Sequence, residues 1–165
     1  SLLSFKQKSS LKLVAARVIA RAPDNWSQAI LIDKGRYNGI RPGMIVINYA
    51  GLIGRIIEVQ DNMSRVILIS DPSLGVSAFL QRSRQEGLVC GSLGGTLLMK
   101  YLPKDSDIKI SDTIVTSGLT NIYPKGLAVG RVVDIGQEFS SLSSYAIIKP
   151  AVDLSALEEV LVIIP

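Results

Sequence analysis

Side chains that commonly carry out catalysis are scarce in this sequence. It contains no histidine, which removes serine and cysteine triads, histidine general bases and zinc sites that depend on histidine. The single cysteine, Cys90, allows neither a disulfide within the chain nor a cluster of thiolates around a metal. No Ser-x-x-Lys sequence has the context that a serine–lysine dyad needs. We therefore expect no catalytic residue, and the chain is predicted not to be an enzyme.

Two other segments have the residue types of ligand sites without their spacing. Asp105 and Asp107 flank Ser106, but the rest of a calcium loop is missing, so a solvated turn is predicted. Gly91-Ser-Leu-Gly-Gly95 is rich in glycine, yet neither Gly-Lys-Ser/Thr nor a helical pattern follows it, which favours a hairpin turn over a phosphate loop. We expect no metal site and no cofactor.

The composition is that of a chain that can bury a core. Of the 165 residues, 47% are hydrophobic and 19% are charged, which excludes intrinsic disorder. No uninterrupted apolar run approaches the roughly 20 residues that cross a bilayer. The chain begins at Ser1 without a stretch that resembles a signal peptide. We therefore expect it to be part of a longer protein, in which any anchor or targeting segment would lie upstream.

The net charge of +4 raises the alternative of a β-barrel that binds single-stranded nucleic acid. Such proteins usually gather Lys and Arg on one face, beside aromatic side chains on which bases stack. Here the basic residues are mostly isolated, with only Arg82 and Arg84 alternating closely, and aromatic residues make up 5% of the chain. We expect no nucleic-acid partner, and a binding measurement can decide the alternative.

The distribution of turn residues predicts an all-β fold. Short aliphatic and β-branched runs alternate with Gly, Pro, Asn and Asp, without helical patterns of about 10–15 residues between them, which is typical of a sandwich or barrel. The expected strands are Val14–Arg21, Gln28–Asp33, Met44–Asn48, Leu52–Val59, Arg65–Ile69, Val76–Gln81, Gly87–Cys90, Leu97–Leu102, Thr113–Ser117, Ala128–Ile135, Ser144–Lys149 and Glu159–Ile164.

An internal repeat organises these strands. Gly51–Val59 and Gly126–Ile135 both contain Gly-Arg, then two β-branched residues, an acidic residue and another β-branched residue. The strands before and after these segments also correspond, which predicts two small tandem barrels. We place the first barrel at residues 14–82 and the second at residues 83–165, with a last strand that can pack back on the first barrel.

Residues 1–13 have a different character. Leu2, Leu3 and Phe5 are interleaved with lysines, and neither Gly nor Pro interrupts the stretch. We interpret it as a short helical remnant, either the end of a coiled-coil helix or a linker. The three apolar side chains are then candidates for oligomerisation contacts.

Four glycines are predicted to shape the backbone. Gly39 and Gly43 follow Asn and Pro in sequences typical of tight turns. Gly54 and Gly130 lie inside the repeated strands. A small barrel must coil its strands strongly, so we expect bends or bulges at these two positions, where a Cβ would clash.

Five side chains are candidates for contact with partners. Arg55 and Arg131 follow the two strand glycines, and strict alternation would place Arg55 on an apolar face near a barrel rim. A structural role for these two arginines is the alternative. The aromatic candidates lie next to predicted loops, where such side chains often anchor partners; they are Tyr49, Tyr123 and Phe139.

The repeat residues resemble the extracytoplasmic domain of the rod shape-determining protein MreC family. The resemblance extends over nearly the whole chain, from Val14 to Ile163. The segments that carry it are Val18-Ile-Ala-Arg21 with Trp26, Ile32-Asp-Lys-Gly35, Gly39-Ile-Arg-Pro-Gly-Met-Ile-Val46, Gly51-Leu-Ile-Gly-Arg55, Ser64-Arg-Val66, Asp71-Pro72, Tyr101-Leu-Pro103, Val115-Thr-Ser-Gly118, Tyr123-Pro-Lys-Gly126, Val129-Gly-Arg131 and Leu157-Glu-Glu-Val-Leu161. The region around Cys90-Gly91 and Gly94-Gly95 departs from the family pattern.

This resemblance implies two barrels on the periplasmic side of the inner membrane, preceded by a transmembrane helix and a coiled coil. It implies a non-catalytic scaffold of bacterial cell elongation, which links membrane and cytoskeletal partners to peptidoglycan synthesis and maintains cell shape. The implied partners are the elongation-specific penicillin-binding transpeptidase, MreD, RodZ and further copies of the chain, as a homodimer or larger assembly. From the residues alone, we expect edge strands and loops to make such contacts.

Overall fold

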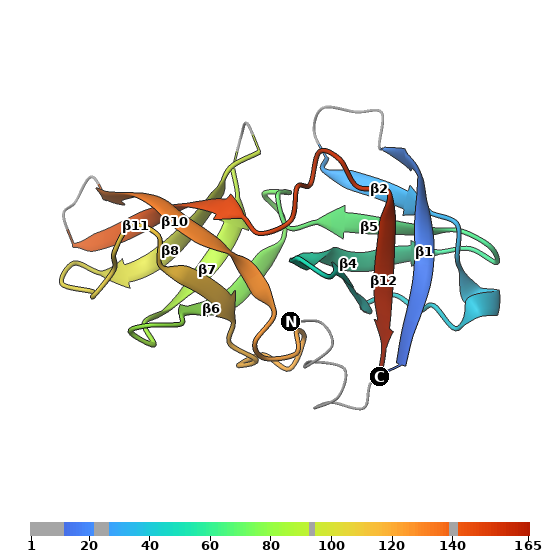
Figure 1. Ribbon diagram of the computed structural model, residues 1–165, viewed down its shortest axis with the longest axis horizontal. Coiled ribbons are helices and arrows are strands. Elements are labelled where there is room, and N and C mark those ends of the chain that lie inside the picture. Colours follow the sequence, from blue (N-terminus) through green and yellow to red (C-terminus); the bar gives the residue numbers. More distant parts are fainter. Residues whose placement is uncertain (1–11, 22–26, 93–94, 139–141) are drawn as a thin grey trace. The chain divides into compact units, whose positions relative to one another are not determined.

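The computed structural model has the all-β fold that the turn pattern predicts (Figure 1). It describes residues 12–21, 27–92, 95–138 and 142–165. The expected helical remnant with its apolar side chains Leu2, Leu3 and Phe5 lies outside the described residues. The elements are β1(Lys12–Arg21), β2(Ala29–Ile32), the 3₁₀ helix η1(Arg36–Asn38), β3(Ile45–Asn48), β4(Gly51–Val59), β5(Ser64–Leu68), β6(Gly75–Leu80), β7(Glu86–Gly91), β8(Leu97–Pro103), β9(Thr113–Thr116), β10(Ala128–Gln137), β11(Ser143–Pro150) and β12(Glu159–Ile164).

The strands form two closed antiparallel barrels, which confirms the predicted architecture. The first barrel has the order β1-β12-β3-β4-β5-β2, and the second has the order β10-β11-β8-β7-β6-β9. Pairing of β1 with β2 and of β10 with β9 closes the two circles. The chain accordingly divides into two units, of which the second is Ile69–Ala151 and the first contains the segments on either side of it.

The boundary expected between residues 82 and 83 needs correction, because the last strand of each repeat closes the other barrel. Around the barrels, the order β3-β4-β5-β2-β1-β12 corresponds to β9-β10-β11-β8-β7-β6. β6 pairs with β7 and β9, and β12 pairs with β1 and β3, so the two strands fill equivalent seams. The last strand of the chain therefore belongs to the first barrel, which is the possibility that the sequence left open.

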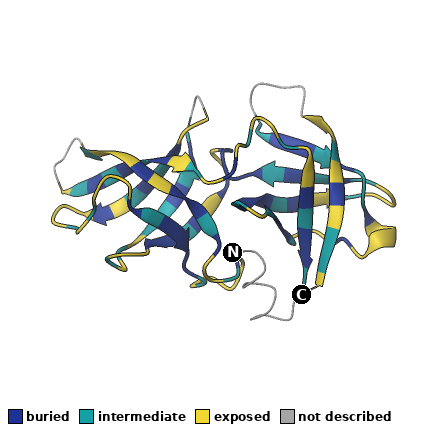
Figure 2. Ribbon diagram, viewed as in Figure 1, coloured by how far each residue is buried: buried dark blue, intermediate teal, exposed yellow. Residues whose placement is uncertain are grey.

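Aliphatic side chains from alternate strand positions fill the first barrel. Figure 2 shows the buried positions along its strands. On β4, Ile56 points into this core and Ile57 is exposed. A register shift between Ile56 and Glu58 marks a bulge, after which Val59 packs against the core. The strict alternation expected along β4 therefore fails at this point, because the extra residue of a bulge changes which side chain faces inward. The fully buried aliphatic residues of the second barrel include Val76, Val89, Met99, Leu102, Ile114, Val132, Ala146 and Ile148.

Gly54 and Gly130 occupy equivalent positions on β4 and β10, where the next strand comes very close. A Cβ at Gly54 would overlap the carbonyl oxygen of Ile67, and a Cβ at Gly130 would overlap that of Lys149. The pairing of both strands with the preceding strand has a register shift close to the glycine. Absence of a side chain lets the backbones approach at this bend, as a barrel of few strands requires.

Gly39 and Gly43 hold two tight turns that lead into β3. Their φ angles are 85° and 93°, in the left-handed region that favours glycine. The N–H of Gly39 donates to the carbonyl of Arg36 and ends η1, and the N–H of Gly43 donates to the carbonyl of Ile56 on β4.

Candidate interaction surfaces

Closure of the barrels determines which kinds of contact the described strands can make. Every strand has a hydrogen-bonded neighbour on both sides, so the described sheets present no free edge for an added strand. The expectation of docking through edge strands is therefore corrected. Contacts with partners must come from outward-facing side chains and from the loops.

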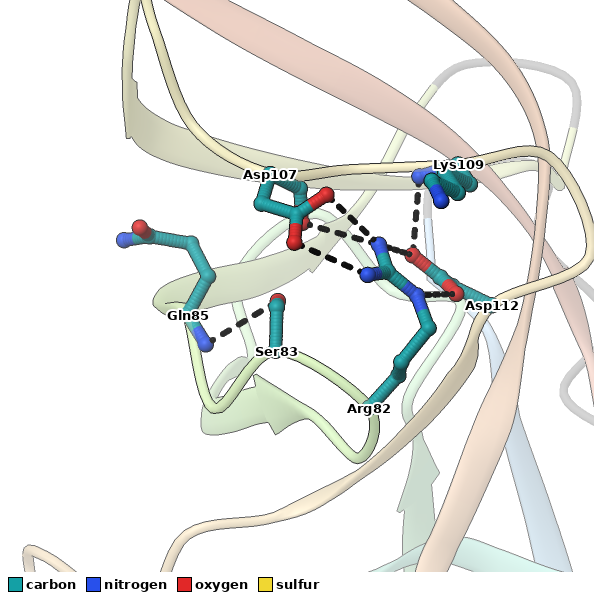
Figure 3. A network of polar contacts seen from close by, with 6 residues as sticks. All are labelled: Arg82, Ser83, Gln85, Asp107, Lys109 and Asp112. Carbon is teal, nitrogen blue, oxygen red and sulfur yellow. Dashed lines mark hydrogen bonds and ion pairs between the residues drawn. The ribbon is translucent and has the colours of Figure 1, made fainter.

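The most connected polar group of the second barrel is Arg82, in the turn between β6 and β7 (Figure 3). Its Nε lies 2.8 Å from Oδ1 of Asp112, and its Nη2 lies 3.0 Å from Oδ2. Its Nη1 and Nη2 also donate to Oδ2 and Oδ1 of Asp107, at 2.8 and 3.0 Å. The backbone N–H of Lys109 donates to Asp112 at 2.8 Å. One guanidinium thus joins the end of β6 to the connection between β8 and β9.

The electrostatics of this cluster describe a structural clamp. Hydrogen bonds from Arg82 hold the pKa of Asp112 and of Asp107 below the ordinary range, although desolvation opposes this effect. The same hydrogen bonds raise the pKa of Arg82 further above its ordinary value. Both carboxylates therefore remain ionised and occupied at neutral pH, which does not suit a general acid or base. The solvated turn expected at Asp107 is in fact one side of this clamp.

The described residues contain few of the groupings associated with ligands. Among them, no set of three or more His, Cys, Asp and Glu side chains is placed to hold a metal ion. In the same part of the chain, no helix has the length and apolar character needed to span a bilayer.

Phe79 on β6 carries two cations on the outer side of the second barrel. The guanidinium carbon of Arg84 lies 5.1 Å from the ring centroid, and Nζ of Lys125 lies 5.8 Å from it. Both distances are within the range of a cation–π interaction. Phe79 is nearly buried, because these two long side chains contribute to its cover. The close alternation of Arg82 and Arg84 in the sequence does not predict this contact, since Lys125 is distant in the sequence.

The two repeated arginines differ in their surroundings. Arg55 is half-buried on β4, between Ile45 on β3 and Ile67 on β5. Arg131 is exposed on β10, and its register partner on β11 is another exposed cation, Lys149. Arg131 is therefore available for contact with a partner, whereas Arg55 is placed among aliphatic side chains.

The aromatic candidates for contact with partners differ in their exposure. Tyr49 is 84% exposed at the tip of the β3–β4 hairpin, where Oδ1 of Asn48 accepts hydrogen bonds from the N–H groups of Ala50 and Gly51. Tyr123 is only 4% exposed, so its proposed role as a partner contact is corrected. Phe139 lies outside the described residues.

Several other apolar side chains, which their sequence patterns do not single out, are exposed. Tyr37 and Tyr101 are exposed, and Tyr101 has a positive φ of 63° within β8. Leu119 and Ile122 are exposed in the connection between β9 and β10. The neighbouring Gly118 and Pro124 indicate a loop but do not reveal which of its apolar residues face outward, because that depends on how the loop packs.

Comparison with known proteins agrees with this architecture. Residues 18–164 match the family described as rod shape-determining protein MreC, barrel core. The cell shape-determining protein MreC of Listeria monocytogenes is 35% identical over 153 residues, which cover 90% of this chain and 52% of that protein. The chain therefore spans about half the length of this curated relative.

Solved structures show the same fold. MreC from Pseudomonas aeruginosa superposes with a TM-score of 0.88 at 26% identity and covers 93% of this chain and 99% of that one. A structure described as the major periplasmic domain of the cell shape-determining filament MreC has a TM-score of 0.79 at 28% identity, with 93% and 95% of the chains covered. A complex of penicillin-binding protein PBP2 with MreC from Helicobacter pylori matches at a TM-score of 0.69 and 16% identity, over 93% and 100% of the chains. This last similarity supports the fold alone. Since the matched family extends over almost all of both barrels, the chain belongs to the MreC family of rod shape-determining proteins.

Proposed function

We propose that this chain is a non-catalytic scaffold of the bacterial cell-elongation machinery, which maintains cell shape by linking membrane and cytoskeletal partners to peptidoglycan synthesis. The observation that carries the proposal is the pair of closed barrels in an MreC family member. Their described residues offer exposed aromatic and basic side chains, and two carboxylates of the second barrel, Asp107 and Asp112, are held by Arg82. Such surfaces suit binding better than chemistry.

The proposed partners are proteins of the cell envelope. The elongation-specific penicillin-binding transpeptidase comes first, supported by the complex described for the Helicobacter pylori MreC. Association with further copies of the chain, as a homodimer or larger assembly, is supported by the filament description of another MreC. MreD and RodZ complete the set on the family resemblance. The location is the extracytoplasmic face, supported by the described periplasmic domain of that relative, with an upstream transmembrane helix as the anchor.

Surface plasmon resonance tests this function directly. The full-length protein in detergent is immobilised, and the cognate elongation transpeptidase is passed over it, with a single-stranded oligonucleotide as the second analyte. We expect specific binding of the transpeptidase and only weak, salt-sensitive retention of the oligonucleotide. Binding of the oligonucleotide tighter than about micromolar, without binding of the transpeptidase, would favour the nucleic-acid alternative. Labelling at a single site by a serine-directed activity probe would contradict the non-catalytic part of the proposal.

A further inference from the structure

We propose that the first barrel bears tension between the segment upstream of β1 and the second barrel, and that the pairing of β1 with β12 is the part that resists it. We call this pairing, of Lys12–Arg17 with Glu159–Ile164, the β1–β12 seam. The source of the tension is the upstream anchor and the partners proposed above, so the biological role of the seam rests on that proposed function. Its mechanical strength rests only on where the chain enters and leaves the first barrel.

The upstream segment enters the first barrel at one end. Lys12 begins β1 and lies opposite Ile164 on β12. Figure 1 shows this start of β1 beside the C-terminus. β1 then runs to Arg21 at the other end of the barrel, where it lies opposite Ile30 on β2. The two ends of β1 therefore mark the two ends of the barrel.

The first link to the second unit leaves from the Arg21 end. β2 begins at Ala29, next to Ile30, which is the register partner of Arg21. β5 runs antiparallel to β2, and its Ile67 lies opposite Ala29. The chain passes to the second unit directly after Leu68. This link therefore starts at the end of the barrel that is remote from the start of β1.

The second link arrives at the same end and is fastened there. The chain re-enters the first unit at Val152, which is 3% exposed and belongs to its core cluster. Leu154 and Leu157 pack against that cluster, and Nη2 of Arg21 donates to the carbonyl of Leu154. β12 then begins at Glu159 and runs antiparallel to β1. A load on this link is therefore passed into β12 at its N-terminal end.

Tension between these entry points acts along the β1–β12 seam. Six register pairs join the two strands, and beyond them the N–H of Val18 donates to the carbonyl of Glu158 at 2.8 Å. The hydrogen bonds of an antiparallel pair are perpendicular to the strands. Because β1 is pulled at one end and β12 at the opposite end, the strands must slide past each other. All the bonds of the seam are then loaded together, and they must break together.

The same seam is weak in another direction. Since Lys12 is the partner of Ile164, the C-terminal end of β12 lies beside the start of β1. Pulling the two termini apart opens the seam from that end, and only the outermost pair is loaded at each step. The seam therefore resists tension that arrives through the second unit much better than tension between the two termini.

The exchange of last strands creates this arrangement. β12 belongs to the second repeat but closes the first barrel, so the partner of β1 continues directly into the second unit. If β6 closed the first barrel and β12 the second, one link would join the two units. In the structure two links join them, and both leave the first barrel at the end opposite to the start of β1. The exchange thus lets two connections share the load.

Optical tweezers test the inference on the 165-residue chain. One handle is attached at the N-terminus, and the other is attached either to Ala151→Cys, on the second link, or after Pro165. Both chains carry Cys90→Ser, which removes the other thiol. We expect the unfolding force to be severalfold higher with the handle at residue 151, because forced unfolding follows the unfolding rate and all bonds of the seam then break together. Ser155→Cys, at another exposed position of the same link, should give the same high force.

Two matched core variants show which strand pairing carries the load. Val162 on β12 and Val66 on β5 are both fully buried in the first barrel. Val162→Ala removes contacts at the seam that must separate, so it should lower the unfolding force measured from residue 151. Val66→Ala should leave this force unchanged, because interactions that persist at the barrier do not alter the unfolding rate. Urea denaturation should show similar losses of stability for the two variants.

The other outcomes have definite meanings. Equal forces in the two pulling directions, or a lower force from residue 151, would overturn the inference. Equal reductions of force by Val162→Ala and Val66→Ala would show that the β1–β12 seam is not the part that yields. Binding of the transpeptidase is measured separately. A chain that binds it but gives equal forces keeps the proposed function and loses the inference, and a chain that resists tension but does not bind loses the proposed function alone.

Discussion

Asp112 accepts two hydrogen bonds from Arg82, at 2.8 Å from Nε and 3.0 Å from Nη2, while its own side chain is only 7% exposed. A nearly buried carboxylate needs such partners, because an unpaired charge away from water is costly. The same arginine also reaches Asp107 on the surface. The pair therefore fixes the turn after β6 against the start of β9 and contributes to closure of the second barrel.

Replacing Asp112 with Ala should destabilise the second barrel. The change removes the acceptor of Arg82 and of the Lys109 N–H, and we expect the free energy of unfolding to fall by about 1–3 kcal/mol. Amide hydrogen exchange, resolved by barrel, is the measurement. Asp105→Ala is the control, since Asp105 is exposed in the same connection. Equal protection in the two variants would show that the clamp contributes nothing to stability.

The clamp also predicts how stability depends on pH. Arg82 lowers the pKa of Asp107 and Asp112 in the folded state, whereas the unfolded chain has the ordinary value of about 3.9. As the pH is lowered, the unfolded state therefore binds protons before the folded state does. The free energy of unfolding then decreases. We expect this contribution to be complete above about pH 5 and to be lost as the pH falls through the lowered folded-state pKa.

Urea denaturation over an acid pH series would measure this effect. Arg82→Met should flatten the acid dependence of the second barrel. The first barrel provides an internal control, because a hydrogen bond from the N–H of Arg17 lowers the pKa of Asp33 and does not involve Arg82. Unchanged acid dependence of the second barrel in Arg82→Met would contradict the assignment.

Gly54 and Gly130, at the two bends where the next strand comes very close, should be essential for stability. Gly54→Ala and Gly130→Ala each place a Cβ against a backbone carbonyl, which cannot move without disturbing the barrel. We expect each to lower the free energy of unfolding by about 3 kcal/mol or more. Gly75→Ala is the control, because its Cβ would meet only the flexible Leu88 side chain, at 3.3 Å. The melting temperature of each variant is the measurement. Similar melting temperatures for all three variants would contradict the prediction that Gly54 and Gly130 allow a close approach of the backbones.

The exchange of last strands predicts which barrel a core substitution affects. Val76 on β6 and Val160 on β12 are both fully buried, each on the strand that the other repeat contributes to its barrel. Each Val→Ala change should cost about 1–3 kcal/mol. Val160→Ala should weaken protection of amides in β1–β5, and Val76→Ala should weaken protection in β7–β11. If Val76→Ala instead weakened protection in β1–β5 and Val160→Ala weakened it in β7–β11, the exchange of last strands between the barrels would be disproved.

Local patterns in the sequence were sufficient for the class of fold and for the repeat. Aliphatic runs separated by turn residues predict strands because side chains alternate across a strand and tight turns need particular backbone angles. The Gly-Arg segments identified β4 and β10 as equivalent. The crowding at Gly54 and Gly130 then follows from coiling of the strands in a small barrel. These features depend on residues that are close together in the chain.

Tertiary structure alone decided the partners of β6 and β12, the burial of Tyr123 and the clamp at Arg82. β6 and β12 have nearly the same alternation of buried and exposed residues, so local patterning suits either strand to either seam. Arg82 meets carboxylates 25 and 30 residues away, and only closure of the barrel brings them within reach. These features are stabilised by contacts between segments that are distant in the chain. The spacing of neighbouring residues in the sequence carries no information about such contacts.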